Sequence, residues 1–402
     1  MKKKILFVIN TMGGAGAETA MIEMIHRLDP SQYEVFVFVL LNQGELIHRL
    51  PPYVTILNEH ISDASVLSAE GKQQLRSYVL KTMFCRGSIF KNIPYLVKNT
   101  FHMLHKKKIM VEKLLWRVMS DAAPVHKQSF DLAIAYLEGG SAYYVADHVK
   151  ADKKVGFIHI DYELAGYGPL LDRTTYEHFD RIYSVSDEVK KHFLNVYPQY
   201  EDKTEVFHNI INQEKIRQRA KEPGGFCDDF DGTRILTVGR LTPQKAYEVA
   251  IEALKLLKDC GEYVRWYVAG DGSERSRLEA KIREYGLEED FILLGSVENP
   301  YPYYAQTDLY VHATRFEGKS IAIQEAQTLG CTLLVSDCSG NREQVISGVD
   351  GLMCELSPQS IKDALVTLIH DKEACLRYAK AAEKKQFDSQ KQLDRLLELM
   401  EE

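Results

Sequence analysis

The sequence predicts an α/β protein made of two doubly wound domains, each with a parallel sheet covered by helices on both faces. The chain has 402 residues, which is enough for two domains with separate cores. Apolar β-rich runs alternate with helical stretches, as they do in proteins with a parallel sheet. The alternation stops once, in a stretch of glycine, proline and acidic residues at 222–232, and then begins again.

The first domain is expected at residues 1–221. Its opening strand, residues 4–9, leads into Gly13 and Gly14 and then into a helix that ends at Asp29 and Pro30. Further strands are predicted at residues 35–40, 132–136, 155–159, 182–185 and 205–207. A basic helical insertion, at about residues 64–128, separates the second of these strands from the third.

The second domain is expected at residues 233–385, after a linker at 222–232. Its strands are predicted at 234–238, 264–269, 291–294, 309–312, 332–336 and 351–354, with helices starting at Pro243, Ser273 and Ser320. Ser357 is a predicted N-cap with Pro358 at the first helical position. The last helix, at 386–402, carries one apolar stripe, and we expect it to return to the first domain. The two sheets should face each other across a ligand-binding cleft.

Composition and charge exclude several classes of protein. With 45% hydrophobic and 27% charged residues, the chain is neither disordered nor fibrous. The longest apolar run covers residues 35–41, whereas a bilayer span needs about 20 residues. The seven cysteines form no Cys-x-x-Cys pair, so we expect reduced thiols. A net charge of −7 argues against nucleic-acid binding. Because the apolar runs are short, we expect a cytoplasmic protein.

The charge is unevenly distributed. Residues 71–130 hold twelve Lys and Arg against two acidic residues. Apolar residues are interleaved with these cations at helical spacings, which is typical of helices that lie in an anionic membrane interface. The candidate membrane contacts are Lys106, Lys107 and Lys108, so we expect peripheral binding to the inner membrane face. The alternative is a solvated face of helices inserted between two strands.

The segment 308–326 is the most informative part of the chain, and two interpretations compete for it. Ala313-x4-Gly318-Lys319-Ser320 is similar to the phosphate loop of NTPases, but the strict motif has glycine at the first position and no carboxylate inside the loop. In the other interpretation, Glu317 and Glu325 flank a helix start. Backbone N–H groups there suit a diphosphate, and a carboxylate two turns into the helix can accept hydrogen bonds from a ribose diol.

Glycines and cations follow the two strands that precede this segment. Strand 235–238 leads into Gly239, Arg240 and Lys245, and Gly270-Asp-Gly272 follows the next strand. A glycine lets the backbone approach a ligand, and arginine binds phosphate through strong, charge-assisted hydrogen bonds. These features favour a phosphate-containing ligand over a merely solvated surface.

In order and spacing, these motifs resemble the C-terminal domain of the retaining family-4 glycosyltransferases over about residues 233–355. The resemblance implies two Rossmann-like domains of the glycosyltransferase B type. It implies a retaining hexosyl- or N-acetylhexosaminyltransferase that uses a nucleotide diphosphosugar, with a UDP-sugar favoured. The acceptor would be a hydroxyl group in polysaccharide, cell-wall or lipid-linked glycan synthesis. No cofactor and no metal are expected, because side chains and helix-start amides meet the donor's charge.

The resemblance also assigns roles to individual residues. His159 matches the family's active-site histidine and would position the sugar, which Glu317 would contact. Arg240 and Lys245 would neutralise the departing diphosphate, whose oxygen is thought to take the acceptor proton on the same face. Glu138, at the end of another strand, is a candidate acceptor contact. The expected donor-binding residues are Gly13, Gly14, Gly239, Arg240, Lys245, Val297, Gly318, Lys319, Ser320, Ile321 and Glu325.

The chain departs from the family pattern at two places. Ala246 stands where the family often has a glycine after the lysine, and Gly318-Lys319 stands where Phe-Gly is frequent. A dinucleotide enzyme would need a third glycine where Thr19 stands, and a phosphorylase of this fold would need a much longer chain. A non-catalytic scaffold has no need of the paired glutamates and cations. An Asp-x-Asp at residues 229–231 lies in the predicted linker, without a strand to position it for a metal.

Overall fold

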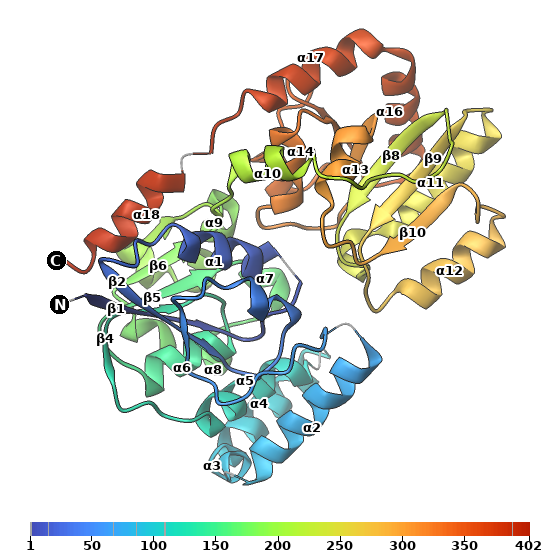
Figure 1. Cartoon of the computed structure of the whole chain (residues 1–402). Coiled ribbons are helices and arrows are strands. Elements are labelled where there is room, and N and C mark those ends of the chain that lie inside the picture. The colour runs from blue at the N-terminus through green and yellow to red at the C-terminus, as the bar shows by residue number, and fades with distance from the viewer. Residues whose placement is uncertain (1, 15, 67, 86, 108–109, 388) are drawn as a thin grey trace. The chain divides into compact units, whose positions relative to one another are not determined.

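The computed structural model describes residues 2–402 except 15, 67, 86, 108–109 and 388. It divides into two compact units, Met1–Ile210 with Asp388–Glu402, and Ile211–Phe387. Each unit is built around one parallel β-sheet, which confirms the predicted fold class (Figure 1).

The first unit has a seven-stranded sheet in the order β3-β2-β1-β4-β5-β6-β7, and all neighbouring strands are parallel. The strands are β1 (Lys3–Ile9), β2 (Tyr33–Val39), β3 (Thr55–Ile56), β4 (Ser129–Ala135), β5 (Lys150–Ile158), β6 (Arg181–Ser184) and β7 (Thr204–Val206). Sequence analysis missed β3, because its two residues are exposed at the sheet edge and leave no apolar pattern.

The helices of the first unit fall into two groups. Those that follow strands are α1 (Gly16–His26), α6 (Gly140–His148), α7 (Tyr162–Ala165), α8 (Pro169–Asp172) and α9 (Asp187–Val196). The insertion between β3 and β4 contains α2 (Ala69–Cys85), α3 (Ser88–Lys91), α4 (Ile93–His105) and α5 (Val111–Ala122). Figure 1 shows these four helices grouped together at one end of the unit.

The C-terminal helix α18 (Ser389–Glu398) also belongs to the first unit. Leu393 and Leu396 of this helix are buried. The Nζ of Lys3 on β1 donates a hydrogen bond to the Met400 carbonyl at 2.9 Å and pairs with Glu401. These contacts attach the end of the chain to the first strand of the same unit.

The second unit has a six-stranded parallel sheet in the order β10-β9-β8-β11-β12-β13. Its strands are β8 (Thr233–Val238), β9 (Val264–Ala269), β10 (Phe291–Gly295), β11 (Leu309–His312), β12 (Thr332–Ser336) and β13 (Leu352–Cys354). Its helices are α10 (Gln213–Arg219), α11 (Tyr247–Asp259), α12 (Arg275–Glu284), α13 (Tyr301–Gln306), α14 (Ile321–Thr328), α15 (Ser339–Arg342), α16 (Pro358–His370) and α17 (Lys372–Glu383).

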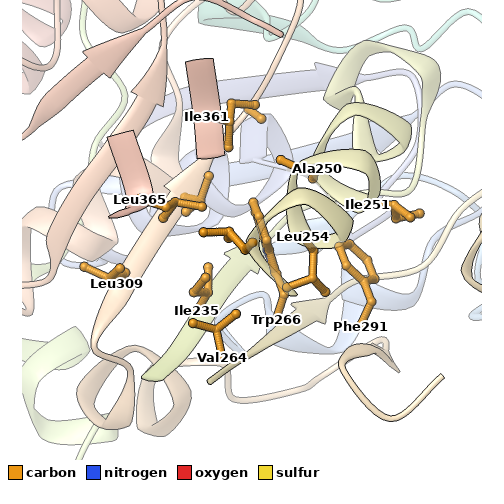
Figure 2. Packing of buried hydrophobic residues seen from close by; sticks show 14 of the residues in the cluster. Ile235, Ala250, Ile251, Leu254, Val264, Trp266, Phe291, Leu309, Ile361 and Leu365 are labelled. Carbon is orange, nitrogen blue, oxygen red and sulfur yellow. The ribbon is translucent and has the colours of Figure 1, made fainter. Parts of the chain in front are cut away.

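The core of the second unit lies between this sheet and helices α11 and α16, as Figure 2 shows. Trp266 is fully buried there, and its Nε1–H donates to Thr237 Oγ1 at 3.0 Å. Replacing such a side chain with alanine costs about 3–5 kcal/mol. The predicted cap of α16 is confirmed, because the Ser357 hydroxyl accepts from the Ser360 N–H at 3.2 Å.

The predicted linker, residues 222–232, lies within the second unit and not at its border. Asp228 contacts Arg234 at 2.9 Å and Arg265 at 3.2 Å, and it accepts a hydrogen bond from Tyr267. Burial raises the pKa of Asp228, but these donors outweigh it and lower the pKa to about 2. The turn-forming residues correctly predict irregular backbone, but the charged contacts attach it to β8 and β9. The units are therefore joined after Ile210.

The helix that was expected to begin at Pro243 begins later. Residues Pro243–Lys245 form a 3-10 turn, and α11 starts at Tyr247. Between them Ala246 adopts a φ of 46°, in the left-handed region that glycine prefers. Ala246 therefore holds a backbone conformation that would be less strained with a glycine at this position.

Candidate functional site

Each sheet has a topological switch point at its centre, where the chain continues to opposite sides of one strand. These points lie between β1 and β4 in the first unit and between β8 and β11 in the second. Open α/β sheets bind ligands at the carboxyl ends of such strands. Candidate residues follow these ends: Gly14 after β1, Glu138 after β4, Arg240 after β8 and Glu317 after β11.

In the second unit, three charged or titratable side chains meet at this point. The Nζ of Lys245 forms an ion pair with Oε2 of Glu317 and lies 3.2 Å from Nε2 of His312. The same imidazole nitrogen lies 3.2 Å from the Glu317 carboxylate, and Nδ1 of the ring is 3.2 Å from the Tyr310 hydroxyl. Sequence analysis predicted Lys245 and Glu317. It missed His312, whose position as the last residue of β11 was the available signal.

The electrostatics of this cluster keep Glu317 ionised. Burial raises the pKa of Glu317, but the charge of Lys245 and the contact with His312 outweigh burial and lower it to about 2. Burial and the charge of Lys245 lower the pKa of His312 to about 4, against the opposing effect of Glu317. At neutral pH the cluster therefore contains a carboxylate, an ammonium group and a neutral imidazole.

The loop that carries Glu317 is supported from α15 and the residues after it. Gln344 binds Ser320 at both of its backbone groups: its Oε1 accepts from the Ser320 N–H at 2.7 Å, and its Nε2 donates to the Ser320 carbonyl at 2.8 Å. A Cβ added to Gly340 would lie 2.4 Å from the carbonyl oxygens of Glu317 and Gly318. Sequence analysis missed Gln344 and Gly340. The Ser320 amide, an expected phosphate donor, is already bonded to a side chain.

Glu325 lies in α14 against helix α13, and the cluster around Lys245 does not include it. Its carboxylate accepts hydrogen bonds from Tyr301 at 3.0 Å and Tyr304 at 3.1 Å. The side chain is buried, and burial raises its pKa to about 7 in spite of the two hydroxyl donors. In this structure both carboxylate oxygens are bonded to tyrosines.

The glycines after β8 and β9 let two loops approach each other closely. A Cβ on Gly270 would lie 2.0 Å from the Gly239 carbonyl oxygen, and one on Gly272 would lie 2.3 Å from the Leu241 carbonyl oxygen. The Gly239 carbonyl also accepts from the Tyr247 hydroxyl at 2.9 Å. These contacts give the two glycines a packing role and hold the backbone that presents Arg240, whose side chain is exposed.

The other expected donor residues of the second unit lie near strand or helix ends. Val297 follows the edge strand β10 and is half-buried. Gly318 and Ile321 are buried beside the start of α14, and Lys319 is half-buried. Only Ile321 belongs to the helix itself.

In the first unit, the glycine turn after β1 is bonded to a carboxylate. Oε1 of Glu45 accepts from the Gly14 N–H at 3.0 Å and from the Ser65 hydroxyl at 3.0 Å. A Cβ on Gly13 would lie 3.0 Å from a methyl group of Val66. An anionic group therefore occupies one of the backbone donors that sequence analysis assigned to a phosphate.

Glu138 and His159 lie next to each other at the ends of β4 and β5. Oε2 of Glu138 accepts from the His159 backbone N–H at 3.0 Å, and burial raises the pKa of this carboxyl group. The His159 ring donates to the Tyr136 carbonyl, and burial lowers its pKa to about 4. Its Nε2 is buried without a hydrogen-bond partner among the described residues. A neutral histidine of this kind can accept a hydrogen bond from a ligand hydroxyl.

The helical insertion packs against this rim of the sheet. A Cβ on Gly139 would lie 2.7 Å from the Tyr167 hydroxyl and 3.0 Å from the Trp116 ring, and Gly139 has a φ of 74°. The Nζ of Lys113 lies 3.9 Å from the centre of the Tyr167 ring. Sequence analysis missed the two aromatic residues, which bring α5 next to Glu138.

The described part of the chain shows neither a cluster of metal-ligating residues nor a helix that could span a bilayer. Within the described ranges, no group of three or more His, Cys, Asp or Glu could hold a metal ion. None of the helices in the described part of the chain has the length and apolar character to cross a bilayer. Lys106 and Lys107 are exposed after α4, and Lys108 lies outside the described residues.

Known proteins match both the sequence and the fold. Residues 229–385 match the sequence model of the family described as Glycosyl transferases group 1. An enzyme of Campylobacter jejuni, named as an N-acetylgalactosamine-N,N'-diacetylbacillosaminyl-diphospho-undecaprenol 4-alpha-N-acetylgalactosaminyltransferase, is 34% identical over 193 residues, which are 47% of this chain and 51% of that enzyme. The amylovoran biosynthesis glycosyltransferase AmsD of Erwinia amylovora is 27% identical over 150 residues, 37% of this chain and 42% of that protein. The matches to curated relatives such as these span about half of their length.

Solved structures resemble both units. Anabaena Alr3699/HepE, in complex with UDP and glucose, superposes with a TM-score of 0.67 at 17% identity and covers 100% of both chains. The sucrose-phosphate synthase of Thermosynechococcus elongatus gives a TM-score of 0.70 at 14% identity, over 100% of this chain and 98% of the other. Together these likenesses show that the chain has the glycosyltransferase B fold, and its residues 229–385 are similar in sequence to the glycosyl transferases group 1 family.

Proposed function

We propose that the protein is a glycosyltransferase that moves a sugar from a nucleotide diphosphosugar to a hydroxyl group. The observation that carries the proposal is the cluster of Lys245, His312 and Glu317 at the switch point of the unit that matches the family. A buried ion pair is costly to build, because both charges lose their hydration. A charged cluster at the expected ligand-binding edge of the sheet therefore favours a functional role.

The second unit would bind the donor. When the bond between the sugar and the nucleotide diphosphate breaks, negative charge develops on the diphosphate. The cations Lys245 and Arg240 would stabilise this charge. Preorganised groups of this kind are worth about 10²–10³ in rate. Since Lys245 also pairs with Glu317, donor binding would redistribute the ammonium contacts between the carboxylate and the phosphate. A UDP-sugar is the favoured donor, which is supported by the structural neighbour solved with UDP and glucose.

The proposed chemistry retains the anomeric configuration and uses no metal. Glu317 would contact the sugar as a carboxylate, and His159 would accept a hydrogen bond from a sugar hydroxyl through its unpartnered Nε2. The departing phosphate oxygen would take the acceptor proton on the face that the leaving group vacates. These roles need a neutral histidine and an ionised glutamate, as the pKa directions of both groups favour.

The acceptor is proposed to be a glycan or a lipid-linked glycan, bound by the first unit near Glu138. Two relatives support a lipid-linked acceptor by name: the Campylobacter enzyme acts on a diphospho-undecaprenol-linked sugar, and a yeast relative is a phosphatidylinositol N-acetylglucosaminyltransferase subunit. Relatives in amylovoran biosynthesis support a polysaccharide.

The competing functions are not favoured. A P-loop NTPase would need the backbone N–H groups of its phosphate loop, but the Ser320 N–H is bonded to Gln344 and the Glu317 carboxylate lies in the same loop. A non-catalytic scaffold does not account for a Lys-His-Glu cluster maintained at the donor end of the sheet.

A donor panel tests the proposal. UDP-, GDP- and ADP-sugars are added to the full chain, and the midpoint of thermal unfolding is recorded. A donor at 100 times its Kd stabilises the protein by about 2.7 kcal/mol. The best donor is then followed by nucleotide release, and the anomeric configuration of the product is read by NMR. No stabilisation by any nucleotide sugar, together with no nucleotide release, would refute the assignment.

A further inference from the structure

Helix α4 exposes a stripe of large apolar side chains on the side opposite to its packed face. Tyr95 and Met103 are buried against the first unit. On the opposite face Ile93, Val97, Phe101 and Leu104 are 49%, 64%, 74% and 54% exposed. Their spacings of four, four and three residues place them within one narrow sector of the helix. The helix is therefore apolar on two sides, and its packing in the unit covers one of them.

The neighbouring helices also expose large apolar side chains. Phe90 of α3 is 64% exposed, Leu80 and Phe84 of α2 are 56% and 55% exposed, and Val111 at the start of α5 is 56% exposed. Helix α3 packs against α2, α4 and α5, so these residues belong to one helical group. Scattered exposed apolar residues need no explanation, but a continuous stripe with apolar neighbours indicates an interaction surface.

Exposed cations lie on or directly after the same helices as the apolar side chains. Lys81, Lys91, Lys98, Lys106 and Lys107 are all exposed. Two other cations of the segment are not part of this surface: Arg117 is 2% exposed and pairs with Asp147, and Lys113 contacts the Ala165 carbonyl. The structure thus separates the basic segment into a set of cations held by internal contacts and an exposed set on and beside the helices that expose apolar side chains.

We infer that helices α2–α5 dock on an anionic lipid bilayer, with α4 parallel to the membrane plane. The side chains of Ile93, Val97, Phe101 and Leu104 enter the boundary between headgroups and acyl chains, and the lysines contact anionic headgroups. Interfacial helices combine an apolar face with Lys and Arg in this way, and each basic residue near such a surface adds to binding. A water-soluble protein partner would not need five exposed lysines on and beside the helices that carry the apolar side chains.

Docking would bring the lipid phase close to the proposed acceptor region. Trp116 of α5 lies beside Gly139, next to Glu138, so the docked helices and the candidate acceptor contact share one part of the first unit. In this respect the inference deepens the proposed function, because it favours an acceptor that is anchored in the membrane. Lipid binding itself does not depend on the donor or on catalysis.

Co-sedimentation of the full chain with vesicles tests the inference. One set of vesicles contains phosphatidylcholine and phosphatidylglycerol, and the other contains phosphatidylcholine alone. We expect binding to the anionic vesicles at low salt and a fall of about tenfold or more in partitioning at 0.5 M salt, where surface charges are screened. Donor binding, measured without vesicles, reports separately on the proposed function.

Two variants and matched controls locate the surface. Val97→Ser/Phe101→Ser/Leu104→Ser replaces three of the four stripe side chains without touching the packed face, and Lys98→Glu/Lys106→Glu/Lys107→Glu reverses three charges. Each should lower the partitioning by about tenfold or more. The controls are Ile346→Ser/Val349→Ser/Leu376→Ser, which are similarly exposed in the second unit, and Lys372→Glu/Arg377→Glu/Lys380→Glu. Both controls should bind like the wild type.

The depth to which the stripe enters the bilayer is measured with one added tryptophan. Fluorescence added by Phe101→Trp should be quenched by brominated lipids, and that added by Leu376→Trp should not. Equal sedimentation with the two kinds of vesicle, or full binding by the stripe variant, would overturn the inference. Self-association without lipid that the stripe variant abolishes would also overturn it, and would assign the stripe to contacts between copies of the chain.

Discussion

The ammonium group of Lys245 and the carboxylate of Glu317 form an ion pair at the switch point of the second sheet, with about 16% and 14% of each side chain exposed. Lys245 lies on the short turn before α11, and Glu317 lies on the loop after β11. The pair therefore connects two loops that are far apart in the sequence. Replacing Lys245, which is in this ion pair, should therefore have different effects from replacing Arg240, whose side chain is exposed.

Replacing Lys245 with alanine should reduce both activity and stability. The change leaves the Glu317 carboxylate buried without its counter-charge, and breaking a buried pair in this way costs about 3–5 kcal/mol. Urea unfolding should report this loss, and turnover should fall by about 10²–10³.

Arg240→Ala should reduce activity alone, because the Arg240 side chain is exposed and supports no core. Its free energy of unfolding should change by about 0.5 kcal/mol or less. Lys255→Ala, on α11, should alter neither property, because Lys255 pairs with Asp259 at the surface. Wild-type turnover in the double variant of Lys245 and Arg240 would show that these cations do not bind the donor phosphates.

Glu325 should give the protein a distinctive pH dependence. Its pKa is raised from 4.5 to about 7 in the folded state, so the unfolded state ionises first as the pH rises. The stability associated with Glu325 is full below about pH 4.5 and is lost as the pH rises through 7, by about 3 kcal/mol. Glu325→Gln should therefore raise the unfolding midpoint at pH 8 and leave it nearly unchanged at pH 4.5.

Glu317 contributes to the pH dependence of stability with the opposite sign. Its pKa is lowered to about 2, so its stabilisation is full above about pH 4.5 and is lost as the pH falls through 2. The contributions of Glu317 and Glu325 to stability can thus be distinguished, because each changes in a different pH range. Glu284→Gln on the exposed surface of α12 is the control for the Glu325 variant. An equal change of midpoint at pH 4.5 and pH 8 would contradict the raised pKa of Glu325.

Much of this arrangement could be predicted from the sequence because it is local. The alternation of strands and helices, the cap at Ser357 and the glycine turns all depend on residues within a few positions of each other. The ends of the parallel strands then place Arg240 and Glu317 at the same edge of the sheet. The fold class and the placement of these candidate residues after the strand ends follow from these patterns.

The remaining features could not be predicted, because they depend on contacts between distant residues. Gln344 binds the backbone of Ser320 from beyond β12, and no spacing in the sequence reports such a contact. Glu45 reaches the Gly14 amide in the same way. Charge counting placed Arg117 with the surface cations, although the fold buries it with Asp147. In all three examples, the group that the side chain contacts is determined by the folded structure and not by neighbouring residues in the sequence.

Gly340→Ala should disturb the loop that carries Glu317. The added methyl group would lie 2.4 Å from two carbonyl oxygens of that loop, which cannot move apart without displacing Glu317. Overpacking of this kind costs about 1–3 kcal/mol. We expect a lower unfolding midpoint and weaker donor binding, measured by calorimetry. Gly168→Ala, where a Cβ meets nothing within 4 Å, should leave both unchanged.

Chelation should leave activity intact. The positive charge for the diphosphate is proposed to come from Lys245, Arg240 and backbone amides, so a divalent ion has no assigned role. Nucleotide release in the presence of EDTA should match release without it. If EDTA abolishes turnover and Mn²⁺ or Mg²⁺ restores it, the Asp-x-Asp residues Asp229 and Asp231 become the first candidates for metal ligands.

His159→Ala should lower turnover while the first unit stays folded. The ring lies at the end of β5 with Nε2 unpartnered among the described residues, so its removal loses one internal hydrogen bond, to the Tyr136 carbonyl. Loss of a positioning contact to the sugar should reduce kcat by about 10²-fold. Because its pKa is lowered to about 4, His159 stays neutral between about pH 6 and 8. Titration of this group should therefore cause no change in the wild-type kcat over that range. His159→Asn, which retains a short polar side chain, should recover part of the rate. Unchanged kcat in His159→Ala, with donor binding intact, would remove this histidine from the proposed site.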